Sequence, residues 1–88
     1  MWLFTKYGFY SISRKSFPGS DKPIQVRARR RKDMLNLKDH LKIEDEIRHT
    51  PNLDYHYRVI VDEKELVRIM MFLAENLDYP NFKRSIHE

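Results

Sequence analysis

The stretch YHYRVIVDEKELVRIMMFL, residues 55–73, joins the clearest strand pattern in this sequence to its clearest helix pattern. Its first seven residues are mostly β-branched or aromatic, which favours a strand from Tyr55 to Val61. Asp62 and Glu65 follow with the spacing of an N-cap and a capping box, in which each side chain can bond the backbone amide of the other. The stretch therefore predicts a strand that leads directly into a helix.

The predicted helix has one apolar face. Its leucine, isoleucine and methionine residues recur at intervals of three and four, which makes a stripe wide enough to cover a sheet: Leu66, Ile69, Met70, Leu73 and Leu77. Pro80 lacks an amide donor and clashes with the preceding turn, so the helix is predicted to end near Leu77. In the motif DYPNFK, residues 78–83, the two aromatic side chains are predicted to fold back over the core, and the alternative is that they dock another protein or a second copy of the chain.

The first half of the sequence has the same order of patterns. Residues 2–14 are dense in aromatic and β-branched types and are predicted to form a strand, in which Gly8 allows a bulge or a close approach. The turn cluster SFPGSDKP then leads to residues 24–30, which alternate between apolar and polar types as a second strand paired with the first. The apolar spacing becomes helical over residues 31–42, and a weaker strand is predicted over residues 46–50.

The order strand, strand, helix, strand, strand, helix predicts an α+β domain. A chain of 88 residues is expected to form a single domain with a small core. We expect a two-layer sandwich in which a four-stranded, mainly antiparallel sheet carries both helices on one face, as in a permuted ferredoxin-like fold. The predicted core combines the apolar faces of the helices and of two strands: Ile24, Val26, Met34, Leu37, Leu41, Val59, Val61, Leu66, Ile69, Met70 and Leu73.

The opposite face of the predicted sheet is basic. Strand alternation directs the polar side chains of the second and fourth strands to this open face, and Lys6 is expected to join them with Phe4 or Trp2. The run VRARRRK, residues 26–32, ends at the corner between strand and helix, where three further basic residues gather. The candidate ligand-binding residues are the basic residues of the face and the corner: Lys6, Arg27, Arg29, Arg30, Arg31, Lys32, His56 and Arg58.

Charge is distributed unevenly along the chain, whose formal net charge is +4. Residues 1–43 hold eleven Lys or Arg and three Asp, whereas residues 44–88 hold six Lys or Arg and ten Asp or Glu. A basic strand face with aromatic residues is typical of proteins that bind single-stranded nucleic acid. The sequence therefore predicts a small non-enzymatic binding protein whose leading ligand is single-stranded nucleic acid or another polyanion. Two alternatives stay open, a homodimeric interaction module and a face that is merely solvated.

The composition argues against several other classes of function. Cysteine is absent, so we expect no disulfide, thiolate metal site or cysteine nucleophile, and the two glycines argue against a glycine-rich phosphate loop. The four histidines lack the spacing of a metal site, so no metal or other cofactor is expected. No serine lies in a nucleophile elbow, so an enzyme is not expected. Neither a signal peptide nor a membrane span is predicted, and the expected location is the cytoplasm.

Four segments of the chain carry a resemblance to known sequences. The opening MWLFTKYGFYS and the motif DYPNFK, with VRAR and DYHYRVIV between them, resemble a family of small uncharacterised bacterial proteins that begin with nearly the same motif. The resemblance covers most of the chain, and its opening motif is fairly specific. It implies no catalytic residue, cofactor or ligand, because no activity established for the family can be carried over. Members of that family often continue past the second motif, whereas this chain ends at Glu88.

Overall fold

Five strands and two helices make up residues 1–77, the part of the chain that the structure, a computed structural model, describes. The elements are β1 (Trp2–Thr5), β2 (Gly8–Ser13), β3 (Ile24–Ala28), α1 (Arg31–Leu41), β4 (Arg48–His49), β5 (Tyr57–Val61) and α2 (Glu63–Glu75). The strands form one antiparallel sheet in the order β1-β2-β3-β5-β4. The α+β class predicted from the sequence is confirmed, but the prediction of four strands is wrong.

The fifth strand arises because residues 2–14 fold as a hairpin and not as one strand. Thr5 closes the turn, since its Oγ1 accepts hydrogen bonds from the amides of Tyr7 and Gly8 at 3.1 and 3.2 Å. Gly8 has a φ of +148°, which side chains rarely allow, and a Cβ atom here would collide with the carboxylate of Asp33. The glycine therefore serves both the turn and the close contact between β2 and α1.

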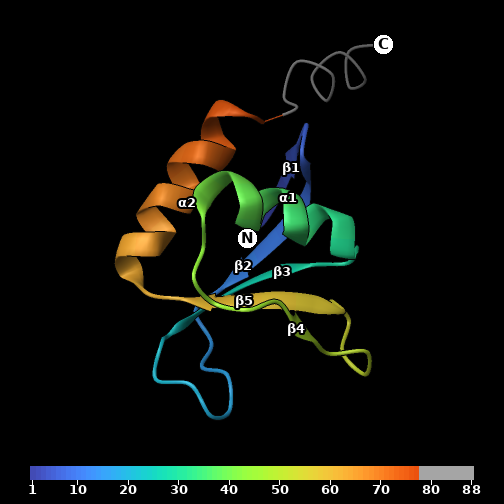
Figure 1. The fold of residues 1–88 in the computed structure, drawn as a ribbon, viewed down its shortest axis with the longest axis vertical. Coiled ribbons are helices and arrows are strands. Elements are labelled where there is room, and N and C mark those ends of the chain that lie inside the picture. The colour runs from blue at the N-terminus through green and yellow to red at the C-terminus, as the bar shows by residue number, and fades with distance from the viewer. Residues whose placement is uncertain (78–88) are drawn as a thin grey trace.

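The hydrophobic core lies between the sheet and the two helices. Strand β3 pairs with β5 in a register that sets Ile24 opposite Val61 and Val26 opposite Val59, so these apolar side chains share one face. Figure 1 shows α1 and α2 on the same side of β3 and β5, with the loop of residues 14–23 on the other side. The predicted core is confirmed for the residues that are at most 1% exposed: Ile24, Val26, Met34, Leu37, Val59, Val61, Ile69 and Leu73.

The β1–β2 hairpin is attached to this core by Tyr10. Its side chain is fully buried, and its hydroxyl donates a hydrogen bond to the backbone oxygen of Asp33 in α1 at 2.6 Å. The core predicted from the sequence does not include Tyr10, because that prediction takes residues 2–14 as a single strand. Three predicted core residues are only partly buried and pack against the cluster: Leu41, Leu66 and Met70.

Helix α2 begins as the sequence predicted. The amide of Glu65 donates to Asp62 Oδ1 at 2.8 Å, and the amide of Asp62 donates to Glu65 Oε1 at 3.5 Å, so the capping box is confirmed. The helix ends at Glu75, and Leu77 then forms an isolated antiparallel bridge with Thr5. The end of the described chain therefore lies beside β1, and the DYPNFK motif, residues 78–83, lies outside the described residues.

Helix α1 and strand β4 complete the domain. α1 starts at Arg31, three residues after β3 ends, and Lys42 caps it in a left-handed conformation with a φ of 52°. Strand β4 has two residues, so the predicted strand over residues 46–50 is shorter than expected. Neither helix described within residues 1–77 is long and apolar enough to cross a membrane.

Candidate nucleic-acid interface

The sheet face opposite the helices carries a row of polar side chains. Ser11 of β2, Arg27 of β3 and Arg58 of β5 lie opposite one another across three adjacent strands. Arg48 of β4 continues the row beside Arg58. Like charges directly opposite each other destabilise a sheet, so a row of three arginines requires compensation. Among these three arginines, only Arg48 forms an ion pair within residues 1–77: its Nη2 lies 3.1 Å from Asp45 Oδ1.

Arg58 is a buried cation held by neutral oxygen atoms. It is 5% exposed, although the sequence predicted a side chain on an open face. Its Nε donates to Thr50 Oγ1 at 3.1 Å, its Nη2 donates to the backbone oxygen of Tyr55 at 3.0 Å, and its Nη1 donates to Gln25 Oε1. Burial, and then the nearby charge of Arg27, lower the pKa of Arg58 from its ordinary value.

Arg27 is half-buried beside Arg58 and uses its hydrogen-bonding groups incompletely. Its Nη2 donates to Ser11 Oγ at 2.7 Å, and its guanidinium carbon lies 4.8 Å from the ring centroid of Tyr55, within cation–π range. Its Nε is buried and has no hydrogen-bond partner in the part of the chain that the structure describes. Arg27 therefore keeps a free donor inside the protein.

The sequence predicts an open face, but part of this face is covered by other segments of the chain. Residues 15–18 and 49–55 stand over part of it, and Ile60, which faces the same side, is fully buried. A hollow of about 750 Å³ remains between these segments. We name it the arginine hollow, and its strand residues are Gln25, Arg27, His49 and Arg58.

A second part of the same face is aromatic and exposed. It lines a hollow of about 530 Å³, and we name it the aromatic surface. Its members come from β1, from β2, from the end of β3 and from the turn before β5: Trp2, Phe4, Phe9, Arg29 and Tyr55. Trp2 is 70% exposed and Phe4 is 62% exposed, whereas most large apolar side chains elsewhere on the sheet are covered.

Ring contacts organise the aromatic surface. The centroids of Phe4 and Phe9 are 4.5 Å apart, and those of Phe9 and Tyr55 are 6.4 Å apart in a stacked arrangement. The guanidinium of Arg29 lies 5.8 Å from the ring of Phe9 and 5.4 Å from the ring of Tyr55. The surface thus offers π-faces and a cation next to one another, which is the combination that single-stranded nucleic acid requires.

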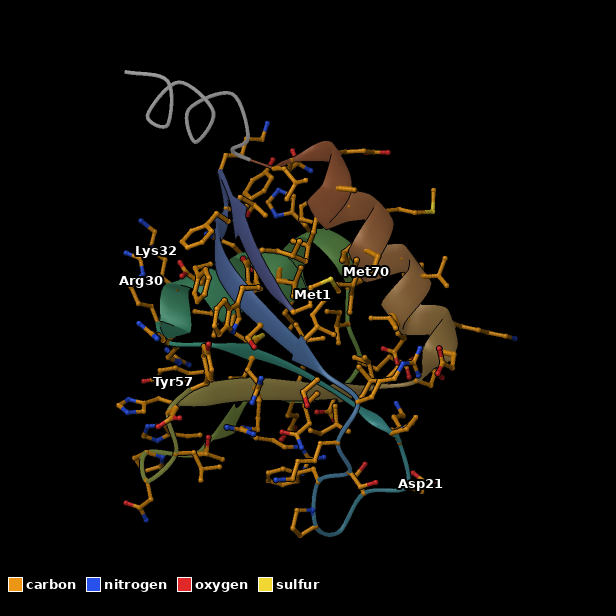
Figure 2. All side chains as sticks on the ribbon, turned by 180° about the vertical axis from the view of Figure 1, so that it is seen from behind. Met1, Asp21, Arg30, Lys32, Tyr57 and Met70 are labelled. Carbon is orange, nitrogen blue, oxygen red and sulfur yellow. The ribbon has the colours of Figure 1, made fainter. Side chains whose placement is uncertain are left out.

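The predicted basic corner is formed by Arg30, Arg31 and Lys32 at the start of α1. Figure 2 shows the side chains of Arg30 and Lys32 projecting away from the body of the protein. Arg30 is partly engaged, since its Nη2 lies 2.8 Å from Asp33 Oδ1 and its Nε donates to Asp33 Oδ2 at 3.3 Å. Arg31 and Lys32 are exposed, and Arg30 also lines the hollow of the aromatic surface, so corner and surface adjoin.

Two predicted site residues lie elsewhere. Lys6 is not on the basic face, because it belongs to the turn between β1 and β2. Its Nζ lies 5.3 Å from the ring of Tyr7, and that ring packs against His40 of α1 and Phe72 of α2. His56 is exposed, but it lines neither hollow. The correction for Lys6 follows from the hairpin, which ends the strand alternation at Thr5.

Sequence reasoning missed Tyr55, which borders both hollows and contacts both Arg27 and Arg29. Alternation places Tyr55 on the same face as Tyr57, the core side of β5. β5 begins only at Tyr57, however, and the turn before it brings the ring of Tyr55 to the opposite face. Phe17 and Thr50 were missed for a related reason, since both lie outside the regular strands and reach the site through loops.

No group of three or more His, Asp or Glu side chains within residues 1–77 is arranged to hold a metal ion. The candidate site is therefore described by its arginines, its aromatic rings and the two hollows. The chain has no significant match to any protein-family model, curated protein or solved structure.

Proposed function

We propose that the protein is a non-enzymatic cytoplasmic protein that binds single-stranded nucleic acid through its aromatic surface and its basic corner. The observation that carries the proposal is the exposure of Trp2 and Phe4 next to Arg29. Bases of a single strand stack on such rings, because every base has a π-face, and the neighbouring cations meet the phosphates. Duplexes should bind less well, since their bases are already stacked on one another.

The two groups of residues should contribute in different ways. Stacking on Trp2 and Phe4 should provide the preference for single strands, while Arg31 and Lys32 should add attraction that depends on charge alone. The proposal differs from the sequence prediction in the role of Arg27, which lies in the arginine hollow beside Arg58. Arg29, directly after the end of β3, is the arginine that accompanies the aromatic rings.

The test is a fluorescence titration that uses Trp2, the single tryptophan of the chain, as its own reporter. Single-stranded oligonucleotides should quench its emission at low salt, and equal lengths of duplex should bind more weakly. In anisotropy titrations with labelled oligonucleotides, Phe4→Ala should weaken binding by about 5- to 150-fold, the range expected when one stacked base is lost.

Val67→Ala is the matched control, because Val67 is an exposed apolar residue of α2 that lies outside the interface. Its affinity should equal that of the unchanged protein. Absence of any binding at low salt would end the proposal. Equal affinities for Phe4→Ala and Val67→Ala would remove the aromatic surface from it.

A homodimer is the alternative, and a specific observation favours it. Within residues 1–77, strand β1 pairs with one strand, β2, and is otherwise contacted by the isolated bridge of Leu77 to Thr5; β1 and the residue before it carry the exposed apolar side chains of Trp2, Phe4 and Met1. An edge strand with apolar side chains is a surface that a second copy can cover. Light scattering over a range of concentrations tests it. A molecular mass of one chain at every concentration would contradict the homodimer and leave the aromatic surface free for a ligand.

We also propose that the fold is a permuted ferredoxin-like sandwich extended by one N-terminal strand. Without β1, the strand order is β2-β3-β5-β4, and α1 and α2 follow β3 and β5 in the chain. An added edge strand would explain why the aromatic surface extends beyond the four strands expected from the sequence.

A further inference from the structure

The arginine hollow holds two covered positive charges, those of Arg27 and Arg58, that the described part of the chain does not neutralise. Within residues 1–77, salt bridges join four cation–carboxylate pairs, and none of them includes Arg27 or Arg58. Lys15 and Asp54 also line the hollow, but both are exposed, and Asp54 forms no salt bridge with either arginine. Because Arg27 and Arg58 face each other on neighbouring strands, an anion between them would relieve their mutual repulsion.

The two guanidinium groups are arranged before any ligand arrives. Gln25, Thr50 and the backbone oxygen of Tyr55 hold Arg58, and Ser11 and the ring of Tyr55 hold Arg27. The buried Nε of Arg27 has no acceptor among the described residues, and a buried donor without an acceptor is unfavourable. The hollow therefore offers fixed donors and positive charge to an incoming acceptor.

We propose that the arginine hollow binds the dianionic phosphate group of a phosphate monoester. Guanidinium groups pair with phosphate oxygens two at a time, and a phosphate monoester carries about −1.5 to −2 charges at pH 7, which matches two arginines. The phosphodiester groups of a nucleic-acid backbone carry only one charge each. A volume of about 750 Å³ leaves room for the organic part of the ligand, and Phe17 and Tyr55 give the hollow aromatic walls.

Two sources can supply this chemical group, and both present the same dianion. One is a free phosphorylated small molecule, and the other is the phosphorylated end of a nucleic-acid strand. Tyr55 lines both the arginine hollow and the hollow of the aromatic surface, so a strand end and its first bases can be accommodated side by side. The proposal does not depend on binding at the aromatic surface, because the free molecule requires the arginine hollow alone.

The test is an isothermal titration of the full chain with adenosine 5′-monophosphate, with adenosine and succinate as matched controls. Adenosine lacks the phosphate, and succinate is a dianion without one. The monophosphate should bind at least about tenfold more tightly than either control. Equal affinity for the monophosphate and adenosine, or for the monophosphate and succinate, would overturn the proposal, and so would the absence of binding by the monophosphate.

Arg27→Gln and Arg68→Gln form a pair of variants that remove the same charge, and Arg68 is an exposed residue of α2 that lines neither hollow. Arg27→Gln should weaken binding of the monophosphate at least about tenfold, whereas Arg68→Gln should change it by less than about twofold. Without ligand, the melting temperature of Arg27→Gln should not fall below that of the unchanged protein, because a like-charge contact with Arg58 is lost. Arg27→Lys keeps the charge without the guanidinium fork and should bind with intermediate affinity, which tests the site if Arg27→Gln does not fold. Similar affinities for the unchanged protein and both Arg27 variants would contradict the proposal.

Oligonucleotides with a 5′-phosphate and a 5′-hydroxyl distinguish the two sources. If a strand end is the ligand, the phosphorylated oligonucleotide should bind more tightly than both its hydroxyl form and the monophosphate. Arg27→Gln should then remove the difference in affinity between the two oligonucleotides. A free small molecule as the ligand predicts equal affinities for the two oligonucleotides, while the monophosphate still depends on Arg27. In either case, the affinity of the Phe4→Ala variant for oligonucleotides tests the aromatic surface separately.

Discussion

Tyr55 is the residue on which both parts of the basic face depend. It is 8% exposed, and its ring lies 4.8 Å from the guanidinium of Arg27 and 5.4 Å from that of Arg29. Its backbone oxygen accepts a hydrogen bond from Arg58. One tyrosine thus contacts three arginines from two neighbouring strands and their ends, and separates the arginine hollow from the aromatic surface. The contacts of this one side chain and its backbone oxygen therefore help to fix the positions of the three guanidinium groups.

Gly8→Ala should destabilise the protein by about 1–3 kcal/mol, because the backbone conformation at this position is strained for a side chain and the added methyl group meets the carboxylate of Asp33. Gly19→Ala is the control, since Gly19 also has a positive φ, of 86°, but has no atom within 4 Å of an added Cβ. Chemical denaturation of both variants measures the difference. Equal losses would mean that the contact with Asp33 contributes nothing beyond the backbone strain.

Tyr10 should make stability depend on alkaline pH. Burial, and then the charge of Asp33, raise the pKa of the Tyr10 hydroxyl above its ordinary value. Its stabilising contribution is complete below pH ~10, the pKa in the unfolded chain, and is lost as the pH rises above that value, because the unfolded state then binds fewer protons. Tyr10→Phe should flatten this decline by up to about 1.4 kcal/mol per pH unit.

Denaturation of the unchanged protein and of Tyr10→Phe from pH 7 to pH 11 measures that slope. At pH 7 the variant should be less stable, because the backbone oxygen of Asp33 loses a hydrogen-bond donor 2.6 Å away. Parallel stability curves above pH 10 would contradict the role of Tyr10 in the pH dependence.

At the scale of elements, α2 presents two different faces. Ile69 and Leu73 are buried against the sheet, whereas Val67 and Met71 are 56% and 61% exposed. The helix is positioned at its start by the capping box of Asp62 and by its short link to β5. Its inner face therefore contributes to the core. Its outer face is exposed, and the candidate interface lies on the other side of the sheet.

Leu73→Ala should lower the free energy of unfolding by about 2–5 kcal/mol, because it leaves a cavity between α2 and the sheet. Met71→Ala, two positions away on the same helix, should change it by less than about 0.5 kcal/mol, since Met71 lies on the exposed face. Urea denaturation of both variants measures the contrast. A larger loss for Met71→Ala than for Leu73→Ala would mean that the helix faces are assigned the wrong way round.

At the scale of the whole molecule, the position of charge matters more than its sum. The formal net charge is +4, yet the sheet face and the adjoining corner hold arginines from β3, β4, β5 and the start of α1. The helices lie on the other side of the sheet, so they leave this face to the loops and to a ligand (Figure 1). A concentrated positive region of this kind attracts polyanions and makes their binding sensitive to salt.

Replacing Arg31 and Lys32 together by Gln should reduce the salt dependence of single-strand binding. Each phosphate contact contributes about 0.7 to the slope of log K against log salt for single strands, so the double variant should lose about 1.4. The preference for single strands over duplex should persist, because the aromatic surface is unchanged. Anisotropy titrations at several salt concentrations give the slope.

Lys42→Gln combined with Lys64→Gln is the control for that experiment. It removes the same net charge from exposed positions at the other end of α1 and on α2. Its slope should match that of the unchanged protein. If both double variants reduce the slope equally, binding responds to net charge alone and the corner has no special role.

The sequence by itself determined the features that depend on local pattern. Alternation and helical spacing predicted the core of β3, β5 and both helices, and the capping residues predicted the start of α2, because these signals arise within a few neighbouring residues. It also placed Arg27 and Arg58 on the sheet face opposite the helices, since alternation along a strand needs no knowledge of the partner strand.

Only the tertiary structure decided which parts of that face are covered and which are exposed. Loop residues 15–18 and 50–55 cover Arg58 and, with His49 of β4, help to form the arginine hollow, and the turn at Thr5 moves Lys6 away from the face. The turn before β5 brings Tyr55 to it. These positions depend on contacts between segments far apart in the chain. Such contacts leave no periodic pattern in the sequence, so burial on this face and the ring contacts are known only from the tertiary structure.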